Sequence, residues 1–393
     1  MQFTPLDKTA RAEWRGLLGP TDGTHLSAAA ILYLSSALVL PLCATEALAG
    51  LYLLYAVVFY YMLTHSVGAV VTVALPGMAL YGMSSVAASL PHPFLLPAVY
   101  TALILGGIGG SFLLIHCREK RHLPLLALPV AVYVVAALIA DPLTALLSLI
   151  PVALSLILGC GILDCRPQTP VLLMLGGALA LSGATAYLIW YGCIGWPVAN
   201  PFVYLGELVR GGMSDVYRQA VVFYAEQGVD MGISDVGISN LAAMVGNILP
   251  GLFLAGCGVL SFVIYRIHLR VLNAWGTLTR VPLRKGAMTV SPLAAGLFVL
   301  SYLIAALAGN TLPGTVFENL ALVLEPALVL VGVAGLLARD AQRRSTLSLL
   351  LLVGLAILLL NYPTVALALA AFVGAVRILL AAALGARAKE DRK

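Results

Sequence analysis

Long apolar runs separated by short polar breaks occupy most of this chain. A membrane core about 30 Å thick requires roughly 20 apolar residues per helix, so each run predicts one transmembrane helix. Two pairs of runs are separated only by residues 44–46 and 141–142, so ten spans remain the alternative to twelve. The pattern predicts an all-α polytopic integral membrane protein with helices at 25–43, 47–64, 67–90, 93–116, 123–140, 143–162, 171–192, 240–265, 290–309, 316–337, 345–361 and 364–385.

Residues 193–239 interrupt this pattern with an amphipathic segment. Asn200-Pro201 is typical of a helix start, and apolar residues then recur at every third or fourth position. Gly211-Gly212 predicts a bend, so we expect a pair of amphipathic helices. The segment either packs in the membrane interface or covers the path of a ligand.

Residues 266–288 form a second interruption, which is rich in positive charge. Basic and apolar residues are interleaved there, which predicts a juxtamembrane helix bound to anionic lipid. The alternative is a docking helix for a cytoplasmic or membrane partner protein, with Trp275, Arg280, Arg284 and Lys285 as contact residues.

The distribution of basic residues orients the predicted helices. If the runs cross the membrane in alternation, nearly all of the 22 Lys and Arg residues fall on one side. Arg210 and Arg218 lie on the opposite side, and Arg377 lies inside the last span. Because Lys and Arg are retained in the cytoplasm, both termini are predicted to be cytoplasmic. The same sorting accounts for the net charge of +5, so we expect no nucleic-acid partner.

Composition supports a lipid-facing surface. Charged residues make up 10% of the chain and hydrophobic residues 61%, whereas soluble domains contain about 25% charged residues. The predicted parts, in chain order, are a cytoplasmic interfacial segment (1–24), a bundle of about seven spans (25–192), the outer amphipathic segment (193–239), a bundle of about five spans (240–385) that contains the basic loop 266–288, and a basic tail (386–393).

Polar side chains at membrane depth are the main functional candidates, because burying them in lipid is costly. Glu325 lies near the middle of its span and Arg377 about 6 Å away in depth, so the two are predicted to form an ion pair. Asn247 precedes Pro250-Gly251, a predicted helix break of the kind that carries binding sites in transporters. The alternative is that such side chains only fix helix packing. The candidate ligand-binding or buried polar residues are Glu325, Arg377, Asn247, Glu318, Asn319 and Asn361.

Sequence motifs for catalysis are not found. The chain has no phosphate-binding loop and no zinc-protease or serine-hydrolase motif. The glycine-rich residues 106–110 fall inside a predicted span, where they predict close helix packing. The six cysteines are scattered and lack the spacing of a metal site. We therefore expect a protein that is not an enzyme and that needs no cofactor or metal.

The order of features from about residue 201 to 384 resembles the YybS-like family of bacterial membrane proteins. The resemblance rests on an outer amphipathic helix ending at 224–228, the span with Leu249-Pro250-Gly251, the basic stretch 280–285, and Gly374 with Arg377 in the final helix. Such proteins are distantly similar to the substrate-binding membrane subunits of energy-coupling-factor transporters. The resemblance implies a helical fold able to hold a small molecule, located in the bacterial cytoplasmic (inner) membrane.

Two function classes follow from these observations. The first is a transport-related protein that binds or moves a small molecule within its helical bundle. The second is a membrane scaffold or accessory protein of cell-envelope or sporulation machinery, in which the buried charges only fix packing.

Overall fold

The computed structural model describes residues 18, 23–42, 45–86, 92–116, 131, 134, 135, 138, 142–164, 166, 168–228, 235–277, 290–309, 311–338, 353–355, 358 and 362–390. The chain divides into two compact units. The first unit comprises Met1–Trp190 and Leu260–Lys285, and the second comprises Tyr191–Val259 and Gly286–Lys393. Every regular element in the described ranges is a helix, so the predicted all-α class is confirmed.

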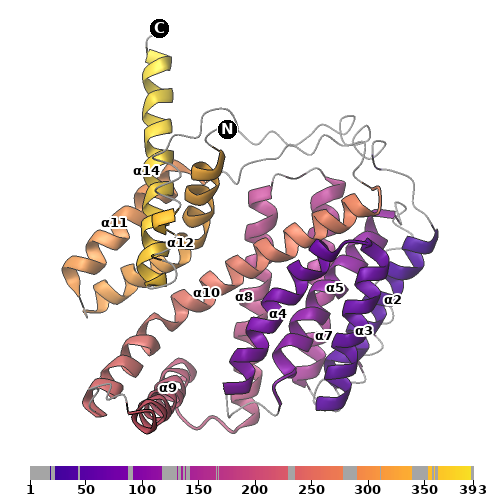
Figure 1. The fold of residues 1–393 in the computed structure, drawn as a ribbon, viewed down its shortest axis with the longest axis horizontal. Coiled ribbons are helices and arrows are strands. Elements are labelled where there is room, and N and C mark those ends of the chain that lie inside the picture. The colour runs from indigo at the N-terminus through magenta and orange to yellow at the C-terminus, as the bar shows by residue number, and fades with distance from the viewer. Residues whose placement is uncertain are drawn as a thin grey trace. The chain divides into compact units, whose positions relative to one another are not determined.

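The helices follow the predicted spans closely (Figure 1). Ten predicted spans coincide in position with a helix, whereas most of residues 123–140 and 345–361 lie outside the described residues. The predicted interfacial segment 1–24 also lies almost wholly outside them. The helices are α2 (Gly23–Leu42), α3 (Glu46–Thr64), α4 (Val67–Val86), α5 (Leu95–His116), α7 (Pro142–Leu163), α8 (Gln168–Cys193), α9 (Pro201–Glu226), α10 (Asp235–Ala274), α11 (Pro292–Ala308), α12 (Leu312–Ala338) and α14 (Pro363–Glu390).

Several helices have the length and composition needed to cross a membrane. Five meet both criteria in the part of the chain that the structure describes: Leu95–His116, Gln168–Cys193, Val236–Ala274, Leu312–Ala334 and Thr364–Leu384. Large apolar side chains on their surfaces are exposed, as with Leu173 and Leu181 of α8, which are 73% and 70% exposed. Apolar surface of this kind is expected to face lipid. The chain is therefore a helical membrane protein.

In the first unit, α5 is the central helix (Figure 1). It packs against α2, α3, α4 and α7, and nearly all its residues are buried. A β-carbon added at Gly109 would lie 2.6 Å from the backbone carbonyl oxygen of Ala29 on α2. One added at Gly107 would lie 3.0 Å from Cβ of Leu154 on α7. The prediction of close packing by residues 106–110 is therefore confirmed.

In the second unit, α11, α12 and α14 pack together around a small apolar core. Gly332 of α12 contacts the backbone carbonyl of Ala370, and Gly374 of α14 contacts that of Leu328. This reciprocal contact brings two helix backbones together without intervening side chains, as small residues do in membrane bundles. The buried core residues are Ala295, Phe298, Ala321, Leu328, Ala371 and Ala375.

Three predictions of where helices bend, begin or end were wrong. Residues 193–239 were expected to hold two helices, but α9 runs without a break from Pro201 to Glu226. Gly211 and Gly212 stay helical because the helix is already formed on both sides of them, and extending an existing helix costs less than starting a new one. The predicted start of the inner segment at residue 266 lies within α10, which extends to Ala274. The predicted tail at 386–393 begins as the last turn of α14, which ends at Glu390.

Candidate functional site

The side chain of Asn319 on α12 binds the backbone of α10 within the second unit. Its Oδ1 accepts a hydrogen bond from the backbone N–H of Gly251 at 2.6 Å. Its Nδ2 donates to the backbone carbonyl of Asn247 at 2.9 Å and to that of Thr315 at 2.8 Å. In an uninterrupted α-helix the Gly251 N–H and the Asn247 carbonyl would pair with each other. The Asn319 carboxamide thus bridges both sides of one turn of α10.

The sequence of α10 explains why this turn accepts a side chain from another helix. Pro250 has no backbone N–H, so the carbonyl of Gly246 loses its donor within the helix. Gly251 has no side chain, and a β-carbon there would lie 2.7 Å from Asn319 Oδ1 and 2.9 Å from Asn319 Cα. Proline therefore weakens the helical ladder at Gly246, and glycine leaves room for the Asn319 amide beside the same turn. The break predicted at Pro250-Gly251 is not found, because α10 runs as one helix from Asp235 to Ala274. This turn is instead a point of attachment for α12.

Arg210 of α9 lies beside the same turn. A β-carbon added at Gly246 would lie 3.3 Å from Arg210 Cγ, so the stem of the arginine passes over this glycine. Its Nη2 donates to Asn247 Oδ1 at 3.5 Å, a long and weak hydrogen bond. Arg210 and Asn247 are both exposed, and no ion pair joins Arg210 to a carboxylate within the described residues. The guanidinium therefore keeps donors available for an anion.

Glu325 and Arg377 do not form the predicted ion pair. Glu325 is half-buried on α12, with the core residues Ala321 and Leu328 one turn before and after it. Arg377 is exposed on α14, although Gly374 and Ala375 beside it are buried. The two described ion pairs are Asp164–Arg166 and Asp215–Arg218. Arg377 is exposed, whereas Gly374 of the same helix meets the backbone of α12.

The remaining predicted site residues are distributed differently. Glu318 is half-buried on α12, next to Asn319. Asn361, Arg280, Arg284 and Lys285 lie outside the described residues. The structure therefore brings together Asn247 and Asn319 from the predicted set and adds Arg210 to them.

Trp275 does not have the exposure expected of a docking residue. It is 4% exposed, and its ring stacks on His25 at a centroid distance of 5.4 Å. The ring of Phe112 meets it edge-on at 4.3 Å. The prediction of a partner contact at Trp275 was wrong, because this side chain packs inside the first unit.

His268 and Arg210 make polar contacts in the structure but were not among the residues selected from the sequence. His268 of α10 is fully buried, and its Nε2 lies 2.8 Å from Oγ of Ser111 on α5. Ser111 is also fully buried, so no substrate could reach this Ser–His pair, and it joins two helices of the first unit. His268 was not a sequence candidate because it lies in a stretch of basic residues that suggested a surface loop. Arg210 could have been noticed, because it is one of two basic residues predicted on the outer side.

Other chemistry is limited in the described part of the chain. No group of three or more His, Cys, Asp or Glu side chains is placed to hold a metal ion there. Cys160, Cys193 and Cys257 form no disulfide within the described residues. The comparisons with known proteins found no matching family model, curated protein or solved structure. Asn247, Asn319 and Arg210 form the one cluster of predicted and neighbouring polar side chains that the described residues bring together.

Proposed function

We propose that the protein is a transport-related membrane protein that binds a small anionic molecule beside the turn of α10 that contains Pro250. One observation carries the proposal. The turn is held by a side chain from a different helix, and the exposed guanidinium of Arg210 lies next to it. Apolar segments whose sequence is interrupted by proline and glycine recur at the substrate sites of transporters.

The chemistry of the site favours a ligand with an anionic group. Arg210 offers several N–H donors in a planar fork that suits a carboxylate or phosphate. The carbonyl of Gly246, left without an intrahelical donor by Pro250, offers an acceptor for an N–H or O–H group of the same ligand. A small molecule that carries an anionic group and a hydrogen-bond donor would bind to Arg210 through the first and to the Gly246 carbonyl through the second.

The bridge made by Asn319 also provides a basis for movement. While the carboxamide is bound, the turn at Pro250 is held against α12. If ligand binding weakened these two hydrogen bonds, α10 could bend at Pro250, where the helical ladder is already incomplete. A bend at one point of a long helix is a recognised way to couple binding to a change of access.

The proposed site is tested by comparing two arginines of the same helix. Arg210→Gln is expected to remove the rise in melting temperature that a bound anion gives to the purified protein, because the ligand loses its charged partner. Arg218→Gln is the matched control, since Arg218 is exposed on α9 and pairs with Asp215 at 3.9 Å. The measurement is a thermal melt with a panel of amino acids, dicarboxylates and phosphorylated metabolites.

Two results would contradict the proposal. One is a panel in which no anion raises the melting temperature of the wild-type protein. The other is an equal loss of stabilisation in the Arg210 and Arg218 variants, since this would indicate general attraction of anions to α9.

For the topology, we propose twelve spans with both termini in the cytoplasm of a bacterial inner membrane and a relationship to the YybS-like family. In a variant whose only cysteine is Cys193, a maleimide that cannot cross membranes is expected to label intact cells, because the end of α8 lies outside and Cys193 is exposed. A variant whose only cysteine is introduced by Ala388→Cys should be labelled only after the cells are opened. The reverse pattern would invert the topology.

A second candidate function is a scaffold of envelope or sporulation machinery. It is favoured by the exposed apolar side chains of α9, among them Val222, Phe223 and Tyr224. Charge reversal at Arg280, Arg284 and Lys285 should then remove proteins that co-purify with the chain. Unchanged co-purification, together with loss of anion binding in the Arg210 variant, would favour the transport-related function.

A further inference from the structure

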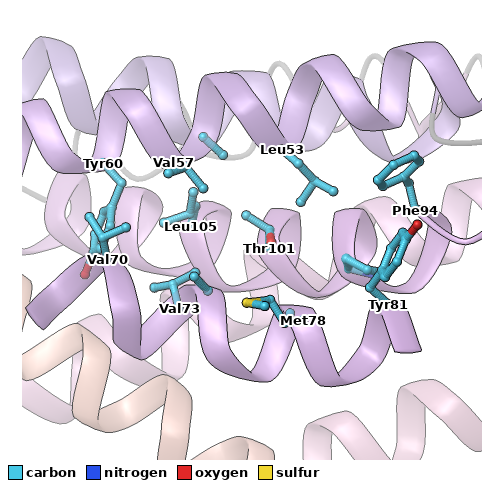
Figure 2. Close-up of a pocket in the computed structure, with 14 residues that line it drawn as sticks. Leu53, Val57, Tyr60, Val70, Val73, Met78, Tyr81, Phe94, Thr101 and Leu105 are labelled. Atoms are coloured by element: carbon cyan, nitrogen blue, oxygen red, sulfur yellow. The ribbon is translucent and has the colours of Figure 1, made fainter. Parts of the chain in front are cut away.

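The first unit contains an apolar cleft between α3 and α4, floored by α5 (Figure 2). Its volume is about 300 Å³, which is at the lower end of the range for small-molecule sites. Apart from Tyr60, Tyr81 and Thr101, every lining residue is apolar. Figure 2 shows Tyr60 and Val70 at one end, and Tyr81 and Phe94 at the other. The Tyr81 and Phe94 rings lie 5.1 Å apart and close that end.

The cleft opens toward the surface that would face lipid. Val57 of α3 and Met78 of α4 line it and are 39% and 70% exposed, respectively. Large apolar side chains beside them, such as Leu54 and Leu75, are also exposed. Molecules that reach the cleft from this side come from the hydrocarbon layer, so they would enter with an apolar part.

The length of the cleft matches one leaflet of a membrane. From Val70 to Tyr81, α4 rises about 16 Å at 1.5 Å per residue, and half of a hydrocarbon core of about 30 Å is about 15 Å. A single hydrocarbon chain of a lipid therefore has the depth to lie along the cleft. A compact polar solute would leave most of this apolar lining without a partner.

The end of the cleft at Tyr60 is polar and positively charged. Tyr60 is 2% exposed, and its hydroxyl has no hydrogen-bond partner within the described residues. The α3–α4 turn begins at His65, five residues after Tyr60. Just beyond it, in the first turn of α4, the carbonyl of Gly68 accepts a hydrogen bond from Nη1 of Arg270 at 3.5 Å. Arg270 belongs to the part of α10 that lies in the first unit, and this hydrogen bond holds its guanidinium at the start of α4. The buried hydroxyl of Tyr60 and the guanidinium of Arg270 therefore lie toward the same end of the cleft, where the headgroup of a lipid would lie.

We propose that this cleft binds one hydrocarbon chain of an anionic phospholipid, whose phosphate-bearing headgroup lies at the α3–α4 turn near Arg270. The charge of Arg270 complements the phosphate, and the Tyr60 hydroxyl supplies a hydrogen-bond donor at the top of the chain. In the proposed topology this turn is cytoplasmic, where anionic lipids attract basic residues. The inference does not depend on the anion site, which lies in the other unit.

The test uses two glycines of α4. A β-carbon at Gly77, which lines the cleft, meets nothing within 4 Å, so Gly77→Leu can fill the cleft without a backbone clash. Gly82 has the same open surroundings but does not line the cleft, which makes Gly82→Leu the matched control. Native mass spectrometry of the full chain in detergent, with added phosphatidylglycerol or phosphatidylcholine of equal chain length, measures the retained lipid.

We expect the wild type and Gly82→Leu to retain phosphatidylglycerol more strongly than phosphatidylcholine. Gly77→Leu should weaken the retention of both lipids about tenfold, because the leucine displaces part of the lipid chain from the cleft and roughly two methylene groups then lose their burial. Arg270→Gln, which changes an exposed side chain, should remove the preference for the anionic lipid and leave retention of phosphatidylcholine unchanged.

The proposal is overturned if the wild type retains neither lipid or if Gly77→Leu retains both as the wild type does. Equal retention of the two lipids by the wild type would overturn the assignment of the headgroup. A preference for phosphatidylglycerol that survives in Arg270→Gln would also overturn it.

Discussion

Replacing Gly109 with leucine is expected to cause the largest loss of stability in the first unit. Gly109 lies where α5 meets the backbone of α2, and a β-carbon there would stand 2.6 Å from the Ala29 carbonyl and 3.0 Å from the Tyr33 nitrogen. Backbone atoms cannot rotate away, so α2 and α5 would have to separate. Overpacking of a buried site costs about 1–3 kcal/mol and occasionally more, and we expect a loss of at least about 3 kcal/mol here.

Unfolding of the purified protein by increasing concentrations of a denaturing detergent measures this loss. Gly177→Leu on α8 is the matched control, because Gly177 is exposed and a β-carbon there meets nothing within 4 Å. Gly109→Ala should fall between the two. If the Gly109 and Gly177 leucine variants unfold at the same detergent concentration, the close contact of α2 with α5 does not stabilise the protein.

Removing the amide of Asn319 should have the largest effect in the second unit. Asn319→Leu keeps the approximate volume of the side chain, but leaves the Gly251 N–H and the Asn247 carbonyl without the side-chain partner that bridges them. Gly251 is buried, and a buried polar group that loses its partner costs about 1–3 kcal/mol, whereas Asn247 is exposed and contributes little. We therefore expect a loss of about 1–3 kcal/mol in the same unfolding measurement.

Asn240→Leu is the control for this substitution, because Asn240 is an exposed amide on α10. It should leave the unfolding free energy almost unchanged. Asn319→Gln keeps the amide but lengthens the side chain, and the close fit at Gly251 should prevent it from restoring full stability. Full stability in Asn319→Leu would show that α10 does not need the bridge from α12.

The two outcomes also separate a structural role from a binding role. Asn319 uses both ends of its amide on protein groups, so its loss should lower stability with or without a ligand. Within the described residues Arg210 makes only a long hydrogen bond, so its loss should change anion binding far more than stability.

Hydropathy predicted the helices well because a membrane imposes a simple condition on each segment. A run of about 20 apolar residues is favourable only as a helix, since the bilayer core offers no partners for backbone groups. Ten predicted spans therefore coincide with helices. The prediction failed at the end of α10, where the basic residues that suggested a new element continue the same helix to Ala274.

The candidate site was predicted in part. Asn247, Asn319 and the Pro250-Gly251 break could be singled out because polar and helix-breaking residues at membrane depth are rare. That Asn319 and this break meet could not be predicted, since they are 68 positions apart along the chain. Arg210 was not among the candidates, although it is one of only two basic residues predicted on the outer side, because a basic residue in an amphipathic helix is usually a solvated side chain.

The sequence by itself determined that this chain forms apolar helices suited to a membrane, and which polar residues lie within them. The tertiary structure decided which of those residues meet. Hydropathy specifies depth along the membrane normal, but it does not specify the rotation of a helix about its axis. Arg377 illustrates the difference, since it follows the buried Ala375 by about 200° of helical rotation and is exposed. Rotation is set by contacts such as those of Gly109, Gly332 and Gly374 with neighbouring backbones, and these exist only once the helices have packed.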